Sequence, residues 1–294
     1  MRTTTRPRRY RVVAAALASL LLVALLASPA GADDAHGAPP RQYYLSLGDS
    51  MAFGLQFDEL DALLAAGTYS PDAFDTGFTD VLAARMQPLR PGQQTVNLSC
   101  PGESAVTMVE GGCSFTAPEP EGMGLTLHTS YAGPQLDAAV AFLRAHPGQV
   151  SPVTVAIGGI DVVDVIAEEC GADRACLDQS GIRERLGALL DQILGALQAA
   201  APDTEIVVVA FHNPFSVEHP ETKPLWRRYY TRVEKEAARR NGVDFANGAN
   251  VIRPSKACVL TFLCDSGDLH PTDEGYHRIG DLVFREAGYR RLEP

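Results

Sequence analysis

Hydrophobic positions along the chain alternate between short continuous apolar runs and longer stretches with helical spacing. Five short runs, rich in Val, Ile, Leu, Tyr and Phe and bounded by turn residues, predict β-strands at residues 43–47, 95–98, 152–157, 205–211 and 242–245. Continuous apolar runs are typical of parallel strands that are covered on both faces. The pattern therefore predicts a sheet that is buried between layers of helices.

Helical spacing appears between these runs. From Ile182 to Leu197, apolar residues recur at one-, three- and four-residue intervals, which places them on one helical face. Residues 136–143, 225–240 and 273–287 predict further helices, the last with Thr272 as its N-cap. Strand–helix alternation without an internal repeat predicts a single α/β domain over residues 43–294, with a mainly parallel sheet. Residues 110–133 form a Gly- and Pro-rich insertion without a clear pattern.

The first 32 residues have the organisation of a secretory signal peptide. Several arginines precede an uncharged stretch over residues 12–27, and a small-residue cleavage pattern follows at residues 30–32. The uncharged stretch is shorter than the roughly 20 residues that span a bilayer, so a membrane anchor is the less favoured alternative. We expect cleavage before Asp33, a flexible leader at residues 33–42, and a secreted, extracellular protein without stable membrane insertion.

The chain has six cysteines, an even number that favours disulfides in an exported protein. Six cysteines allow fifteen pairings. The spacing favours pairs of sequence neighbours: Cys100–Cys113, Cys170–Cys176 and Cys258–Cys264. A metal site is the alternative, but the chain has no C-x2-C pair, and its histidines do not cluster with the cysteines. We therefore expect three local disulfides and no metal.

The formal net charge of the chain is −11 at pH 7. An acidic protein repels phosphate backbones, which argues against a general nucleic-acid-binding role. The predicted helix at 225–240 is rich in Arg and Lys, but Glu234 and Glu236 are interleaved among them. This mixture favours a solvated helix face over a nucleic-acid-binding patch.

Candidate chemistry follows the predicted strands, where ligands bind in open α/β sheets. The first strand is followed by Gly48-Asp49-Ser50 and the second by Pro101-Gly102, while His270-Pro271 precedes the last helix. A serine, glycine turns and a histidine in these places are the ingredients of acyl transfer.

Each of these residues has a role that its chemistry suits. Ser50 is the candidate nucleophile, and His270 is the candidate base because imidazole titrates near neutrality. A carboxylate, Asp268 or Asp265, is expected to orient the imidazole. The backbone N–H groups of Ser50 and Gly102 are the candidate donors to the oxyanion.

The same segments resemble the sequence blocks of the GDSL, or SGNH, hydrolases. Residues 45–50 (LSLGDS) resemble the first block, residues 97–104 (NLSCPGES) the second with its oxyanion glycine, residues 157–161 (IGGID) the third, and residues 268–276 (DLHPTDEGY) the last with its histidine. The resemblance implies a three-layer α/β/α sandwich with a flavodoxin-like, mainly parallel sheet. It also implies esterase, lipase or related acylhydrolase activity without a metal or organic cofactor. Three local cysteine pairs resemble the secreted actinobacterial branch of this family.

Two positions depart from the family pattern. Ile160 stands where the family has an Asn that donates to the oxyanion, and an isoleucine side chain has no donor. Asn213 is a possible substitute, although Asn213-Pro214 also fits an ordinary turn. Gly267 occupies the usual position of the acid, so that Asp268 comes one residue late, and some family members orient the histidine with a backbone carbonyl instead.

The leading hypothesis is a secreted serine carboxylic-ester hydrolase that acts on a small-molecule or lipid ester. One alternative is a non-catalytic module that binds an ester or a glycan on the same fold. Another is a polysaccharide deacetylase or an acyltransferase, with an acylated glycan or an alcohol as partner. Two other histidines, His212 and His128, fit structural roles better than catalytic ones.

Overall fold

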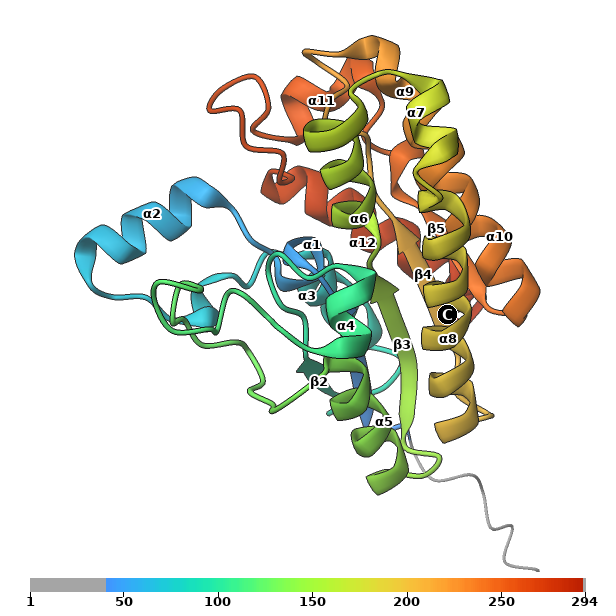
Figure 1. Cartoon of the computed structure of the whole chain (residues 1–294). Coiled ribbons are helices and arrows are strands. Elements are labelled where there is room, and N and C mark those ends of the chain that lie inside the picture. Colours follow the sequence, from blue (N-terminus) through green and yellow to red (C-terminus); the bar gives the residue numbers. More distant parts are fainter. Residues whose placement is uncertain (1–40, 293–294) are drawn as a thin grey trace, which may run out of the picture. The chain divides into compact units, whose positions relative to one another are not determined.

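The computed structural model describes residues 41–292 (Figure 1). The expected signal peptide lies outside the described residues, and so do residues 33–40 of the expected leader. No helix within the described range is both long and apolar enough to cross a membrane.

Five parallel strands form one sheet in the order β2-β1-β3-β4-β5. They are β1 (Tyr43–Gly48), β2 (Gln94–Asn97), β3 (Val150–Ala156), β4 (Ile206–Ala210) and β5 (Asp244–Asn247). This order is the flavodoxin-like one, and it places the reversal of strand order between β1 and β3. All five predicted strands are present. The last begins two residues later than predicted, because Gly242 adopts a left-handed conformation (φ 64°) that ends the preceding helix.

The helices that the sequence predicts are also present, among shorter ones. The α-helices of the described chain are α1 (Ser50–Phe53), α2 (Phe57–Ala66), α3 (Phe78–Met86), α4 (Ala105–Glu110), α5 (Gln135–Ala145), α6 (Gly159–Asp164), α7 (Arg174–Gln179), α8 (Ile182–Ala200), α9 (Lys223–Trp226), α10 (Arg232–Asn241), α11 (Pro254–Leu260) and α12 (Asp273–Glu286). The single helix predicted at 225–240 is α9 and α10, joined by a π-helical turn at Arg227–Thr231.

Helices cover both faces of the sheet. The packed group of α4, α5, α8 and α10 lies on one face, and α3 packs with α12 on the other (Figure 1). Strands β3 and β4 are buried along their whole length, and α8 turns its predicted apolar face into the core. The expected three-layer α/β/α sandwich is confirmed.

The patternless insertion at residues 110–133 has a small core of its own. A hydrophobic cluster separate from the main core joins it to α1 and α2: Phe53, Leu55, Leu60, Phe74, Cys100, Phe115 and Leu127. Because its apolar residues are irregularly spaced, the insertion shows neither helical nor strand periodicity in the sequence, yet it still packs.

The structure contains the three expected disulfides, Cys100–Cys113, Cys170–Cys176 and Cys258–Cys264. The first joins cysteines that are 13 residues apart in the sequence, and each of the others joins cysteines that are 6 residues apart. Cys100 and Cys113 lie near the Glu103 carboxylate, but their bond to each other leaves no thiolate to bind a metal ion there.

Candidate active site

A tight turn at the end of β1 positions Ser50. Gly48 has a positive φ of 141°, and a Cβ at this position would lie 2.0 Å from the Ala156 carbonyl oxygen, so the turn accepts only glycine. The buried Gln135 side chain accepts the Gly48 N–H at 2.7 Å and donates to the Gly48 carbonyl at 3.0 Å. These contacts fix the backbone immediately before the nucleophile candidate, and sequence analysis did not identify Gln135.

Asp49 begins the short helix α1 that carries Ser50. Its Oδ1 accepts the Met51 N–H at 2.9 Å. Burial raises the pKa of Asp49 to about 7, with the nearby acids Asp161 and Glu103 acting in the same direction. The Ser50 side chain itself lies at the carboxyl edge of the sheet and is 8% exposed.

His270 lies in the segment between α11 and α12. Its carbonyl accepts the Phe262 N–H at 3.2 Å, and Thr272 caps α12 by accepting the Gly275 N–H at 3.2 Å. The preceding residue, Leu269, is held through its carbonyl by Nε2 of the buried His212 at 3.0 Å. The imidazole is thereby fixed from both sides along the chain.

The structure brings Ser50, His270 and Asp268 together. The Ser50 Oγ lies 2.9 Å from Nε2 of His270, and Nδ1 of the same ring lies 2.5 Å from Oδ1 of Asp268. Asp265 is exposed and makes no contact with the imidazole. Of the two carboxylates considered from the sequence, Asp268 is therefore the one in position.

The Asp268 carboxylate is held by three N–H groups. Oδ1 also accepts the backbone N–H of His270 at 2.9 Å, and Oδ2 accepts that of Phe57 at 2.9 Å. Burial acts to raise the pKa of Asp268, but these hydrogen bonds and the His270 ring hold it below its usual value. The group is thus an anion at neutral pH, as stabilising an imidazolium requires.

Two residues that line the cleft, Ser50 and Gly102, have backbone N–H groups without a partner in the described chain. Gly102 has a positive φ of 81° and follows β2, on the loop that the Cys100–Cys113 disulfide closes. Both residues line one cleft with His270, which is the arrangement that an oxyanion needs.

The third family block, residues 157–161, departs from the family pattern at Ile160. Ile160 lines the cleft beside Ser50 and offers no side-chain donor. Asp161, the next residue, accepts the Ala105 N–H at 2.7 Å and so ties α6 to the start of α4. Burial raises the pKa of Asp161, although this N–H acts to lower it.

Asn213 does not replace the missing amide. Its Nδ2 donates to the Thr222 hydroxyl at 2.8 Å, and its Oδ1 accepts the Phe215 N–H at 3.1 Å. Both ends of the side chain are therefore committed to the turn after β4, as the alternative interpretation of Asn213-Pro214 predicts.

The two other histidines considered from the sequence, His212 and His128, have structural contacts. Burial lowers the pKa of His212 to about 4, so its ring is neutral at neutral pH and donates from Nε2 to the loop that carries His270. His128 contacts the Phe53 carbonyl at 3.0 Å and packs against the Phe53 ring. His212 thus positions the neighbour of the candidate base, and His128 supports the end of α1.

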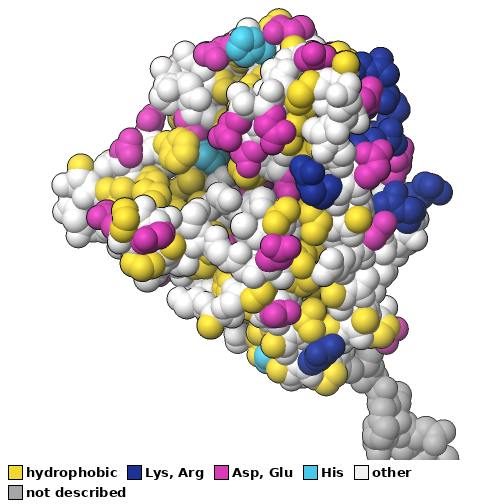
Figure 2. All heavy atoms as spheres, viewed as in Figure 1, with side chains coloured by type: hydrophobic (Ala, Val, Ile, Leu, Met, Phe, Trp, Pro, Cys, Tyr) yellow, Lys and Arg dark blue, Asp and Glu magenta, His cyan; other side chains and the backbone are white. Residues whose placement is uncertain are grey.

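An apolar cleft of about 290 Å³ opens in front of Ser50. Its walls include Leu60 of α2, Phe115 and Met123 of the insertion, and Phe57. The Phe57 ring makes a T-shaped contact with the His270 imidazole, with ring centroids 4.8 Å apart. Figure 2 shows hydrophobic side chains gathered over the lobe formed by α2 and the insertion, where Phe57 and Met123 are each 45% exposed. A small recess of about 30 Å³ lies on the other side of Ser50 and Ile160, lined by His212 and Trp226.

Solved structures with a similar fold include an extracellular lipase from Streptomyces rimosus. It is 17% identical, with a TM-score of 0.54, over 82% of this chain and 99% of the other. An acetylxylan esterase from Geobacillus stearothermophilus, solved as a catalytic mutant, is 16% identical with a TM-score of 0.51, over 85% and 95% of the two chains. At these identities the likeness establishes a common fold. A search of curated protein sequences gives no match.

The sequence itself matches the GDSL-like Lipase/Acylhydrolase family over residues 46–278. This range begins in β1 and ends in α12, so it includes every segment that contributes to the cleft around Ser50. Because the match spans most of the chain, the protein belongs to the GDSL-like lipase/acylhydrolase family and is an ester hydrolase of that general type.

Proposed function

We propose that the protein is a secreted serine carboxylic-ester hydrolase in which Ser50, His270 and Asp268 act as nucleophile, base and orienting acid. The observation that carries the proposal is the continuous chain of contacts from the Ser50 Oγ through the imidazole to Asp268, at 2.9 and 2.5 Å. A hydroxyl is a weak nucleophile until a base takes its proton, and the His270 imidazole is positioned to be that base.

The reaction proceeds through an acyl-enzyme. The Ser50 Oγ attacks the ester carbonyl while Nε2 of His270 takes its proton, and the N–H groups of Ser50 and Gly102 stabilise the resulting oxyanion. Collapse breaks the bond to the alcohol, which leaves with the proton from Nε2. Water then attacks the acyl group by the same route, releasing the acid and restoring the Ser50 hydroxyl.

The Ser114 hydroxyl, on the insertion, is our candidate for a third oxyanion donor. A Cβ at Gly102 would lie 3.2 Å from the Ser114 Oγ, and this hydroxyl makes no hydrogen bond to another described residue. Ser114 lines the same cleft as Ser50 and Gly102. We assign to Ser114 the role that the family Asn plays, because Ile160 cannot fill it.

The walls of the cleft support an ester with an apolar acyl group. Hydrophobic side chains dominate the lining, and each buried methylene contributes about 0.8 kcal/mol to binding. The fold shared with an acetylxylan esterase keeps an acetylated glycan as an alternative substrate. A panel of acyl-chain lengths and acetylated glycans separates the two.

Ile160 supports a second candidate function, a non-catalytic module that binds an ester or glycan in the same cleft. Such a module needs no oxyanion donors and tolerates an isoleucine at this position. It predicts ligand binding without turnover and without covalent modification of Ser50.

The deciding experiment compares the wild type with Ser50→Ala on p-nitrophenyl esters of short and medium acyl chains. We expect turnover by the wild type only, and labelling of Ser50 by a fluorophosphonate probe. Equal rates in the two proteins would end the proposal, and binding without either turnover or labelling would favour the non-catalytic module.

Secretion is supported by the three disulfides and by the signal-peptide pattern of residues 1–32. Expression of the full chain in a secreting host is expected to release a mature protein that begins at Asp33. N-terminal sequencing of the protein from the medium tests this, and an uncleaved N-terminus that stays with the membrane fraction contradicts it.

A further inference from the structure

A cavity of about 480 Å³, separate from the cleft at Ser50, lies between α7 and the segment that runs from α9 to α10. Apart from Pro224 and Leu225, its lining consists of cationic side chains: Arg174, Lys223, Arg227, Arg228 and Arg232. We call it the cationic pocket. Figure 2 shows Lys and Arg side chains gathered on this side of the molecule, although the whole chain has a net charge of −11.

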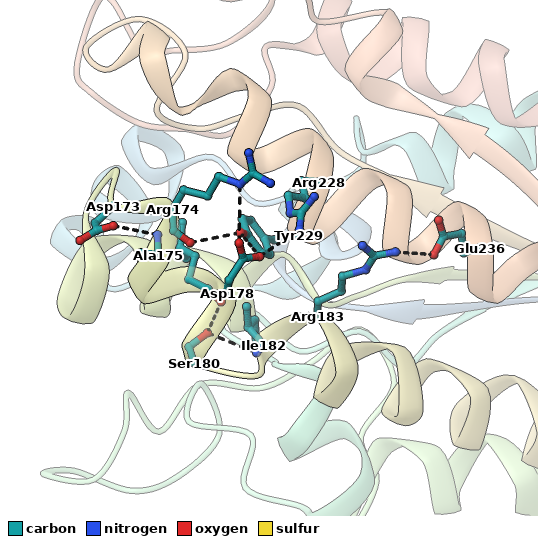
Figure 3. A network of polar contacts seen from close by, with 11 residues as sticks. Asp173, Arg174, Ala175, Asp178, Ser180, Ile182, Arg183, Arg228, Tyr229 and Glu236 are labelled. Carbon is teal, nitrogen blue, oxygen red and sulfur yellow. Dashed lines mark hydrogen bonds and ion pairs between the residues drawn. The ribbon is translucent and has the colours of Figure 1, made fainter.

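The glutamates that are interleaved in the sequence do not neutralise this pocket. Glu234 is fully buried and contacts the core beside Tyr230. Glu236 pairs with Arg183 of α8 at 3.0 Å (Figure 3). The cations of this segment lie on a solvated face, as the sequence predicts, since Arg227, Arg232 and Arg239 are all exposed. The two glutamates, however, do not pair with the cations that line the pocket.

One carboxylate, Asp178, partly balances the pocket. It pairs with Arg228 at 3.0 Å and with Arg174 at 3.6 Å, and it accepts the Tyr229 hydroxyl at 2.8 Å (Figure 3). These contacts hold Arg228 in place over the Tyr229 ring. Within the described chain, Lys223, Arg227 and Arg232 form no ion pair, so three charges stay uncompensated.

The helix geometry brings these uncompensated charges together. Lys223 precedes Arg227 by four residues, which is one helical turn. In the π-helical turn, the Arg232 N–H bonds to the Arg227 carbonyl, so these two arginines also stand one turn apart on the same side. Like charges at this spacing repel each other and destabilise a helix. A bound anion would reduce this repulsion.

We propose that the cationic pocket binds a molecule that carries a phosphate group. A guanidinium presents paired N–H donors that match phosphate oxygens, and a dianion needs at least two cations that no carboxylate already occupies. The pocket leaves room for an organic portion against Pro224 and Leu225. Leu225 lines this pocket, while its neighbour Trp226 lines the recess behind Ser50, so the two sites border different parts of α9.

The test measures binding of glycerol 3-phosphate and of inorganic phosphate by isothermal titration calorimetry at low ionic strength. The double variant Arg227→Gln/Arg232→Gln removes two exposed charges that no residue pairs with. We expect binding to weaken at least about tenfold in this variant, as loss of charge-assisted hydrogen bonds predicts. Its control, Lys235→Gln/Arg239→Gln, removes the same charge from α10 outside the pocket and is expected to bind like the wild type.

A second arm distinguishes a soluble phosphate ester from a lipid headgroup. Cosedimentation with phosphatidylcholine vesicles, with and without phosphatidylglycerol, is measured for the same three proteins. If only the pocket variant loses binding, in the calorimetric or in the vesicle experiment, the proposal is supported. The experiment in which binding is lost identifies the phosphate as that of a soluble ester or of a lipid headgroup. The proposal is overturned if the wild type binds neither probe, or if both double variants lose binding equally. Neither readout depends on ester hydrolysis.

Discussion

At the scale of single residues, the carboxylate next to His270 is the sharpest test of the site. Asp268→Asn is expected to lower kcat by about 10²–10⁴-fold, because an amide cannot stabilise the imidazolium and favours the wrong tautomer. Asp265→Asn changes a neighbouring acid that does not contact the ring and is expected to keep wild-type kcat. Steady-state kinetics on one ester checks both. Equal loss in the two variants would contradict the assignment of Asp268.

A second residue-scale prediction concerns the missing amide at Ile160. Removing the Ser114 hydroxyl by Ser114→Ala is expected to lower kcat by up to about 10²-fold with little change in KM, because an oxyanion donor acts mainly in the transition state. Ile160→Asn in the same background is expected to restore much of that loss. Thr116→Ala, on the same loop, is the control, because its hydroxyl bonds only the Cys113 carbonyl. A Ser114→Ala enzyme with wild-type kcat would remove Ser114 from the site.

At the scale of elements, the Cys100–Cys113 disulfide closes a loop that lines the cleft, and the Cys170–Cys176 disulfide lies outside it. Cys100–Cys113 closes the loop that carries Gly102, whereas Cys170–Cys176 joins the end of the π-helical segment Val165–Cys170 to α7. Replacing either pair with serines is expected to lower the free energy of unfolding by about 2–4 kcal/mol. Only loss of Cys100–Cys113 is expected to lower kcat as well, because it releases an oxyanion donor.

Chemical denaturation and kinetics on the two double variants check this prediction. Kinetics must be run at a temperature at which both variants are folded, so that a lower kcat reports the loop and not unfolding. Wild-type kcat in the Cys100→Ser/Cys113→Ser protein would show that the bridge stabilises the fold without positioning Gly102.

At the scale of the whole molecule, the buried carboxyl groups couple stability to pH. The pKa of Asp49 rises from its usual value to about 7 in the folded protein, so the folded state binds more protons than the unfolded state between about pH 4 and 7. Stability from this group is therefore fully present below pH 4 and is lost as the pH rises toward 7. The raised pKa values of Glu103 and Asp161 act in the same direction.

Asp49→Asn is expected to flatten this dependence, since the amide still offers an oxygen to the Met51 N–H and does not titrate. The free energy of unfolding is expected to fall less between pH 5 and pH 8 in the variant than in the wild type, by roughly 1–3 kcal/mol. Urea denaturation at several pH values measures the difference, with Asp265→Asn as the exposed control. An unchanged slope in Asp49→Asn would contradict the role of this carboxyl.

Much of the architecture could be predicted from the sequence because it depends on local patterns. The apolar run in β4 and the spacing of Leu186, Leu190 and Leu197 in α8 show their burial through periodicity alone. The π-helical turn in the predicted helix at 225–240 has no such pattern and depends on packing against its neighbours. The packing of the insertion at 110–133 cannot be predicted from sequence periodicity either, because Phe115 and Leu127 are buried by contacts with α1 and α2.

The sequence by itself determined the strand–helix order, the local cysteine pairs and the residues from which a nucleophile, a base and an oxyanion site could be built, since each depends on residue type and short spacing. Only the tertiary structure decided which of Asp268 and Asp265 reaches His270, that Asn213 is committed to a turn, and that Gln135 braces the Gly48 turn. It also buried Glu234 and paired Glu236 with Arg183 of α8. These outcomes depend on distances between segments far apart in the chain or on which way a side chain turns, and local patterns carry no information about either.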